Sequence, residues 1–431
     1  MQWINTLSVR PSLEAAIAEV VTAVQQTLTQ PPDLGVLFVS SAYASEYPRV
    51  VPLLLERLPL KGLIGCGGGG VIGMKSGEQV VEVEGGVAVS LSVACLPEVE
   101  FQVFHLEAEV LPDLDSPPGA WTQLLGIEPD KNPQFILLSD PFSARITDLL
   151  AGLDFAYPGA VKIGGLASSS TMGLQSGLFC YSPEQPAPAL YREGTVGVAI
   201  SGKIIVETIV AQGCRPIGQP YRVAEAERNV VLQVEEQSVP AEMVARGARH
   251  AALQTPLEAL QELVHTMDAD ERELAQYSLS VGIVRNEFKQ DLEPGDFLIR
   301  NLIGVDPRIG AIAIGDRIRP GQRIQFHIRD AQASADDLEQ LFQQYWHKHS
   351  KGDGQPIAAL LFDCLGRGER FYGEPDFDSH LFSQYFQEIP VSGFFCNGEI
   401  GPIGGATFLH GYTAAFGIFR SQAPSIVPET L

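Results

Sequence analysis

The feature of this 431-residue sequence that most constrains its fold is a strand-helix-strand pattern that occurs three times. Each copy has a short apolar run, a helical segment and a second apolar run that contains glycine. The distances from the start of a copy to this glycine are 29 residues (Val36 to Gly65), 29 residues (Phe135 to Gly164) and 34 residues (Ala359 to Gly393). Apolar runs of this length are typical of buried parallel strands, so we predict three β-α-β units.

Other segments predict antiparallel hairpins and further helices. Residues 80–93 and 195–210 are rich in β-branched residues and contain the turn sequences EGG and SGK. Residues 12–28 have apolar side chains at helical spacing, and we predict a helical block from Val239 to Tyr277. The sequence therefore predicts a mixed α/β fold of two related halves, 1–220 and 221–431, with mixed sheets flanked by helices.

The charge balance excludes two classes of partner. The chain has 52 acidic and 29 basic residues, a formal net charge of -23, and the excess is spread over both halves. Without a basic region, we expect no binding to nucleic acid or to anionic membranes. We also expect no membrane insertion and a cytoplasmic location, since no apolar run reaches the roughly 20 residues of a spanning helix. The six cysteines form no C-x-x-C pair, so we predict neither disulfides nor a zinc site.

A nine-residue segment occurs twice, each time at the end of a predicted β-α-β unit. GCGGGGVIG (Gly65–Gly73) and GFFCNGEIG (Gly393–Gly401) share glycine at the first, sixth and ninth positions and isoleucine at the eighth. Glycine lets a strand bend sharply and present backbone N–H groups to a ligand, whereas the alternative is that these glycines only allow close packing. A nucleotide site is disfavoured, because no G-K-[ST] sequence and no basic residue accompanies the glycines.

These segments resemble the FIST family. GCGGGGVIG is similar to the glycine-rich segment of the FIST N-terminal region, and the FIST C-terminal region resembles four stretches: residues 297–316, 317–341, 359–373 and 391–405. The resemblance implies a sensory module for a small ligand such as an amino acid, with output through a separate partner protein. Some family members resemble haem-based nitric-oxide sensors, and others are fused to F-box adaptors. The family's glutamate is present at Glu399, but Val71 replaces it in the N-terminal copy.

The candidate ligand-binding residues follow the predicted strands or belong to these motifs. Ligands of open α/β sheets bind at the carboxyl ends of strands, where small polar or reactive side chains occur in all three units. Arginine can hold a carboxylate through two hydrogen bonds, and a guanidinium near Cys364 would favour its thiolate. The alternatives are structural ion pairs for the arginines and a buried apolar role for the thiol. The candidates are Cys66, Gly67, Ser139, Asp140, Arg300, Asn301, Cys364, Arg367, Gly368, Cys396, Asn397 and Glu399.

Three other functions stay open at this point. A haem-based gas sensor needs only one axial histidine, although no cofactor is otherwise predicted. A cysteine-dependent hydrolase or transferase would need a base beside Cys66, Cys364 or Cys396, and the sequence contains no local Cys-His signature. A protein-interaction scaffold would instead present an exposed apolar patch. We expect a binding module rather than an enzyme or a metal protein, and a homodimer is left open.

Overall fold

The computed structural model describes residues 1–75, 79–143, 145–170, 176–236, 253–349 and 355–422. The chain forms two compact units. Unit 1 contains residues 1–211 and 339–431, and unit 2 contains residues 212–338. The C-terminal half of the sequence therefore contributes to both units. The division of the sequence into regions 1–220 and 221–431 stays a prediction.

Unit 1 contains three mixed sheets, each built around one predicted β-α-β unit. In sheet A the order is β1-β6-β2-β3-β10-β11, with β2 and β3 parallel. Helix α2 (Tyr47–Arg57) connects these two strands. The strands are β1 (Gln2–Ser8), β6 (Val89–Cys95), β2 (Leu34–Ser40), β3 (Gly62–Gly68), β10 (Leu178–Ser182) and β11 (Gln185–Tyr191).

Sheet C follows the same plan around the second unit, in the order β7-β12-β8-β9-β23-β24. Helix α4 (Ile146–Ala156) connects the parallel strands β8 and β9. The strands are β7 (Val99–Leu106), β12 (Thr195–Gly202), β8 (Gln134–Ser139), β9 (Lys162–Leu166), β23 (Glu399–Ile403) and β24 (Ala406–His410).

Sheet B is built around the third β-α-β unit, in the order β13-β25-β21-β22-β4-β5. Helices α9 (Glu369–Tyr372) and α10 (Phe377–Tyr385) lie between the parallel strands β21 and β22. The strands are β13 (Ile204–Ala211), β25 (Ala414–Ser421), β21 (Pro356–Cys364), β22 (Val391–Cys396), β4 (Gly70–Lys75) and β5 (Gln79–Glu84). The predicted mixed α/β fold with three β-α-β units and antiparallel hairpins is confirmed.

The three sheets are joined by exchanged hairpins. After the second parallel strand of a unit, the chain leaves that sheet and forms a hairpin at the edge of another. Hairpin β4–β5 follows β3 of sheet A and pairs with β22 of sheet B. Hairpin β23–β24 follows β22 and pairs with β9 of sheet C, and hairpin β10–β11 follows β9 and pairs with β3. Each sheet is thus completed by strands from another repeat.

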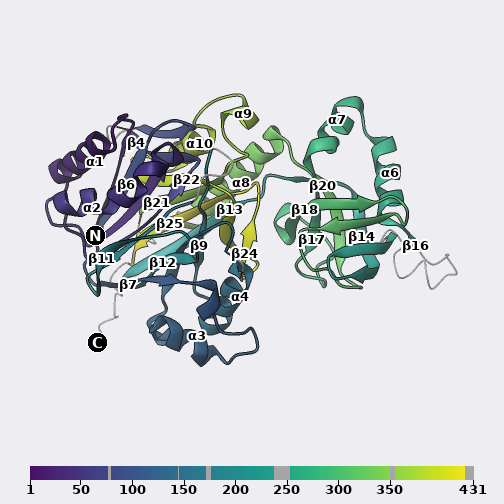
Figure 1. Ribbon diagram of the computed structural model, residues 1–431. Helices are drawn as coiled ribbons and strands as arrows, with labels where there is room; N and C mark the ends of the chain where they lie inside the picture. The colour runs from purple at the N-terminus through teal and green to yellow at the C-terminus, as the bar shows by residue number, and fades with distance from the viewer. Residues whose placement is uncertain (76–78, 144, 171–175, 237–252, 350–354, 423–431) are drawn as a thin grey trace, which may run out of the picture. The chain divides into compact units, whose positions relative to one another are not determined.

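One apolar core lies between the inner faces of the three sheets, and helices cover their outer faces (Figure 1). Phe38, Phe362 and Phe394 contact one another in this core. Helices α1 (Leu13–Thr27) and α2 pack on sheet A, and α3 (Pro118–Leu125) and α4 pack on sheet C. Helix α10 and the C-terminal part of α8 (Ala331–His349) cover sheet B through aromatic contacts to Phe416. The predicted helix at residues 12–28 corresponds to α1.

Unit 2 is a closed barrel with its own apolar core. Its sheet has the order β14-β20-β17-β18-β19-β15-β16, and six strands close because β14 also pairs with β15. The strands are β14 (Arg215–Glu227), β20 (Arg323–Ile328), β17 (Leu279–Val284), β18 (Phe297–Asp306), β19 (Ala311–Ile314), β15 (Val230–Glu236) and β16 (Leu253–Gln254). Helices α6 (Pro256–Thr266) and α7 (Ala269–Ser278) account for the predicted helical block from residue 256 onward, whereas residues 253–254 of that block form the strand β16. The part of the block before residue 253 lies outside the described residues.

Candidate functional site

The glycine that ends each β-α-β spacing lies against the preceding parallel strand. Gly65 pairs with Leu37, Gly164 with Leu137 and Gly393 with Leu361. A Cβ on any of the three glycines would overlap the carbonyl oxygen of its partner leucine. The common glycine is therefore required by the close approach of two backbones.

The glycine-rich strand ends of sheets A, B and C contact one another through hydrogen bonds. Ser168 contacts two of them, since its N–H donates to the carbonyl of Gly67 (3.2 Å) and its hydroxyl donates to the carbonyl of Phe395. The N–H groups of Gly67 and Gly69 donate to the Gly177 carbonyl and the Ser168 hydroxyl, both at 2.8 Å. These N–H groups are satisfied within the protein, so the packing alternative accounts for these glycines. The role of Gly67 in ligand binding stays a prediction.

Arg367 is the centre of a buried charged network beside sheet B. The side chain is fully buried, and its guanidinium donates two hydrogen bonds to Asp378, Nε to Oδ2 at 2.8 Å and Nη2 to Oδ1 at 3.0 Å. Asp363 at the end of β21 lies 3.2 Å from Nε, and Nη2 also donates a hydrogen bond to the hydroxyl of Tyr372. Arg367 does hold a carboxylate through two hydrogen bonds, but this carboxylate is that of Asp378 in the protein itself.

Hairpin β4–β5 adds two more carboxylates to this region. Glu82 is buried and accepts a hydrogen bond from the N–H of Ser379 (2.8 Å) in α10. Burial, with the nearby charge of Asp378, raises the pKa of Glu82 to about 8. Glu84 accepts from the N–H of Glu369 (2.7 Å), and a Cβ on Gly368 would overlap its carboxylate. Gly368 therefore gives Glu84 access to the start of α9.

Glu399 and Val71 occupy the same position in the two copies of the nine-residue segment, and the structure also places them at equivalent positions. It pairs with Gly165, the residue after Gly164, and Val71 pairs with Phe394, the residue after Gly393. Val71 and Glu399 are thus equivalent in two of the exchanged hairpins. Glu399 is fully buried and accepts hydrogen bonds from the N–H (3.1 Å) and hydroxyl (2.8 Å) of Thr413. Burial raises the pKa of Glu399 to about 8, so the carboxyl group is largely protonated at neutral pH.

The three candidate cysteines are buried thiols. Cys364 and Cys396 are partners in the parallel strands β21 and β22, and Cys396 and Cys66 belong to the core between the sheets. Burial raises the pKa of the Cys364 thiol to about 12, and it raises the pKa of Cys66 and Cys396 as well. A thiolate at Cys364 is therefore not favoured, because burial penalises the charged form of the thiol. The role of the three cysteines in ligand binding stays a prediction.

The remaining predicted residues lie apart from this network. Ser139 bonds to Thr195 (2.7 Å), and Asp140 accepts from the hydroxyl of Ser176 (2.5 Å), both at the end of β8. Asn397 donates its N–H to the carbonyl of Leu166 (3.0 Å). Arg300 and Asn301 belong to unit 2, where Arg300 forms an ion pair with Asp316 (2.8 Å). The structure thus places a protein carboxylate beside each predicted arginine.

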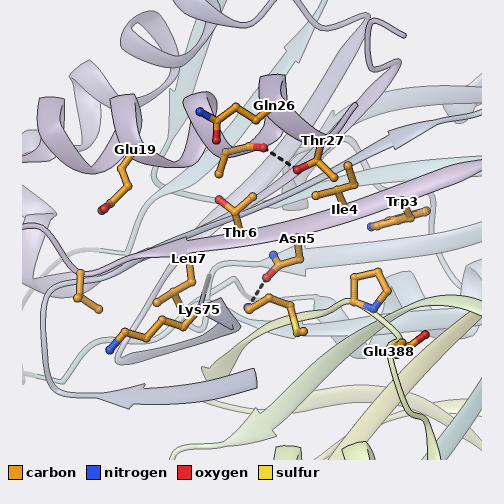
Figure 2. Close-up of a pocket in the computed structure, with 14 residues that line it drawn as sticks. Trp3, Ile4, Asn5, Thr6, Leu7, Glu19, Gln26, Thr27, Lys75 and Glu388 are labelled. Atoms are coloured by element: carbon orange, nitrogen blue, oxygen red, sulfur yellow. Dashed lines mark hydrogen bonds between the residues drawn. The ribbon is translucent and has the colours of Figure 1, made fainter. Parts of the chain in front are cut away.

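A hollow of about 560 Å³ lies elsewhere in unit 1, along β1 (Figure 2). Consecutive residues from Trp3 to Leu7 line it. Since successive side chains of a strand point to opposite faces, the hollow runs along the edge of β1. This edge is free, because β1 is the outer strand of sheet A and pairs with β6 on its other side. Backbone N–H and C=O groups at a free edge are available to a ligand.

Polar side chains surround this free edge. Glu19 of α1, Lys75 of β4 and Glu388 after α10 line the hollow. The indole N–H of Trp3 is buried and has no hydrogen-bond partner in the described part of the chain. In Figure 2 this nitrogen lies on the side of the ring that is nearer to Asn5. A buried donor without a partner is rare in proteins, and a bound ligand would satisfy it.

Sequence reasoning did not find this hollow. No strand was predicted at residues 2–8, although the alternation of Trp3, Asn5 and Leu7 with Ile4 and Thr6 fits a strand. No sequence signal places this strand beside Lys75 and Glu388, because hairpin exchange brings β4 there.

The sequence of this protein matches the models of two known domains. Residues 33–237 match the FIST N domain and residues 256–402 match the FIST C domain. The chain belongs to the FIST family, whose domains are sensory or signalling domains.

Relatives of similar length are known from mycobacteria. An uncharacterized protein of Mycobacterium tuberculosis is 32% identical over 416 residues, which cover 96% of this chain and 98% of the relative. An uncharacterized protein of Mycobacterium bovis is 30% identical over 408 residues, covering 94% and 95%. An F-box/LRR-repeat protein of Arabidopsis thaliana is 33% identical over 90 residues, 20% of this chain and 17% of that protein. Among the described residues, no helix is long and apolar enough to cross a membrane.

Proposed function

We propose that this protein is a sensory module that binds a small ligand in the hollow along β1, and that the ligand is an amino acid or a related metabolite. The observation that carries the proposal is the buried indole N–H of Trp3, which has no partner among the described residues and belongs to a residue that lines a hollow of about 560 Å³. Ligand pockets combine apolar walls with a few polar groups that fix orientation, and hollows of this size are typical of them.

The charges of the hollow suit a zwitterion. Lys75 offers an ammonium group to a ligand carboxylate, and Glu388 offers a carboxylate to a ligand amine. Glu19 also lines the hollow, but it is already paired with Arg10 (3.3 Å). The free edge of β1 can add backbone donors and acceptors. The ring of Trp3 stacks on Phe419 with centroids 4.7 Å apart, so the donor is held in a fixed place.

The proposed site can also report occupancy to the buried network. Lys75 ends β4, and β5 of the same hairpin carries Glu82. Glu388 lies shortly after α10, which carries Asp378. A ligand held between Lys75 and Glu388 would therefore favour one particular distance between hairpin β4–β5 and α10. The proposed output passes to a separate partner protein.

Thermal unfolding with a panel of amino acids and metabolites tests the proposal. We expect at least one member to raise the unfolding temperature, and Trp3→Phe to weaken its binding about tenfold, because this change deletes the donor and keeps the ring. Trp346→Phe is the matched control, since this tryptophan lies on α8 outside the hollow. An absence of stabilisation by the whole panel, or equal binding by Trp3→Phe and wild type, would contradict it. The absorption spectrum of the same sample tests for haem, which the proposal does not require.

A further inference from the structure

A second hollow, of about 850 Å³, lies on the barrel of unit 2 and is lined by three arginines. Arg228 follows β14, and Arg317 and Arg319 lie in the segment after β19. All three side chains are exposed, and within the described residues none of them forms an ion pair. Asp316 also lines the hollow, but it is held by Arg300 (2.8 Å). The wall therefore has an excess of positive charge.

This excess is unusual for the chain in which it occurs. Acidic residues outnumber basic ones by 52 to 29, and Arg308, another exposed arginine of unit 2, has a carboxylate partner in Asp306 (2.8 Å). Guanidinium groups bind carboxylates through planar pairs of hydrogen bonds. Three guanidinium groups that have no ion-pair partner among the described residues line this one hollow. They therefore favour an acidic occupant.

Apolar side chains beside the arginines indicate what else the occupant presents. Ile303 lines the hollow and is 61% exposed. Val305, two residues further along β18, lies on the same face of the strand and is 43% exposed. A small inorganic anion would use the arginines and leave these side chains in water. A peptide with carboxylates next to an apolar residue would use both.

The hollow and the covalent connections of unit 2 lie at different ends of the barrel. The chain enters and leaves unit 2 near Arg215 and after Ile328, which are paired at one end of β14 and β20. Arg228 lies beyond the other end of β14, and Arg319 lies before the start of β20. The covalent connections of the unit therefore do not cross the arginine-lined end.

We propose that the surface formed by Arg228, Arg317, Arg319 and Ile303 is the docking site for an acidic segment of a separate partner protein. Carboxylates of the segment pair with the arginines, and an apolar side chain packs on Ile303. This proposal rests on the proposed sensory function, because it gives the kind of partner that the sensory module would bind. Its experiment uses no small ligand, so failure of one proposal can be distinguished from failure of the other.

Selection of short random peptides on the full-length protein tests this surface. We expect the selected peptides to be enriched in Asp and Glu next to one apolar residue. A selected peptide, labelled with fluorescein, should bind about tenfold more weakly to Arg317→Glu/Arg319→Glu and several-fold more weakly to Ile303→Ser. The matched control is Arg308→Glu, which reverses an exposed arginine of the same unit outside the hollow and should bind as wild type does.

Four results would overturn the proposal. The first is a selection that yields no acidic peptides, and the second is equal binding of a selected peptide by wild type and Arg317→Glu/Arg319→Glu. The third is binding of citrate or inorganic phosphate that displaces the peptide while Ile303→Ser has no effect, which would make this a small-anion site. The fourth is self-association in sedimentation that Arg317→Glu/Arg319→Glu abolishes, which would make a second copy of the chain the occupant. Circular dichroism of each variant shows that it is folded, so a loss of binding reports on the surface.

Discussion

Arg367 and Asp378 form a fully buried ion pair with two hydrogen bonds, at 2.8 and 3.0 Å. The arginine belongs to the loop after β21 and the aspartate to α10, so the pair fixes this helix to the end of the strand. Asp363 and Glu82 are two further buried carboxyl groups in the same region. Burial and the charge of Asp378 raise the pKa of Asp363.

Removing one partner of this pair should destabilise unit 1 strongly. Asp378→Asn leaves the guanidinium of Arg367 buried without its main counter-charge, and we expect a loss of about 3–5 kcal/mol in the free energy of unfolding. Urea unfolding at constant pH measures it. Asp306→Asn is the control, because this exposed pair with Arg308 should matter little. A loss no larger than that of the control would show that the network does not hold α10 in place.

The three equivalent glycines should tolerate no side chain. Gly65→Ala, Gly164→Ala and Gly393→Ala each place a Cβ against the carbonyl of a neighbouring strand. We expect each to cost about 1–3 kcal/mol or more, measured by denaturant unfolding. Gly119→Ala is the matched control, because nothing lies within 4 Å of the added Cβ and the site is in α3. Wild-type stability in all three variants would refute the backbone-contact explanation of the repeat.

Unit 1 should lose stability as the pH rises toward 8. Burial raises the pKa of Glu399 to about 8 from an ordinary value of 4.5, so between these values the folded state keeps a proton that the unfolded state has released. Folding then weakens by up to about 1.4 kcal/mol for each pH unit and each such proton. Glu399→Gln removes one of these protons and should flatten the pH dependence, measured by urea unfolding at several pH values. Unchanged pH dependence would show that Glu399 is ionised in the folded protein. The exposed Glu98→Gln serves as the comparison.

Unit 2 should respond to pH in the opposite direction. Burial lowers the pKa of His327 to about 4 from an ordinary value of 6.5. Between these values the unfolded state binds a proton that the folded state does not, so this contribution to stability is present above about pH 6.5 and is lost as the pH falls toward 4. His327→Gln should make unfolding of the barrel less dependent on acid, followed by hydrogen exchange of β17 and β20. His265→Gln, in α6, is the control. Equal acid dependence in both variants would argue against a buried neutral His327.

Much of the local structure could be predicted from the sequence. The three β-α-β units follow from apolar runs of the right length, and each forms a parallel pair in its own sheet. The equivalence of Val71 and Glu399 follows from the nine-residue repeat and is confirmed by the register. The third exchanged hairpin, β10–β11, could not be predicted from this repeat. A longer connection joins β9 to β10, and the nine-residue pattern is absent there. Structural features that depend on residues close together in the sequence could therefore be predicted.

The partners of the candidate residues could not be predicted in the same way. Arg367 was identified as a residue able to hold a carboxylate, but only the fold brings Asp378 to it and places Glu82 of a different hairpin nearby. The burial that raises the pKa of the Cys364 thiol could not be predicted either, since burial is a property of the packed structure.

The sequence by itself determined the repeating strands, their glycine positions and the acidic character of the chain, because these depend on local periodicity and composition. Only the tertiary structure decided that each hairpin completes another repeat's sheet, that residues 212–338 form a separate barrel, and that β1 has a free edge beside Lys75 and Glu388. These features arise from contacts between segments distant in sequence. Such contacts are selected by the burial of apolar surface and by backbone pairing, for which a single sequence carries no positional signal.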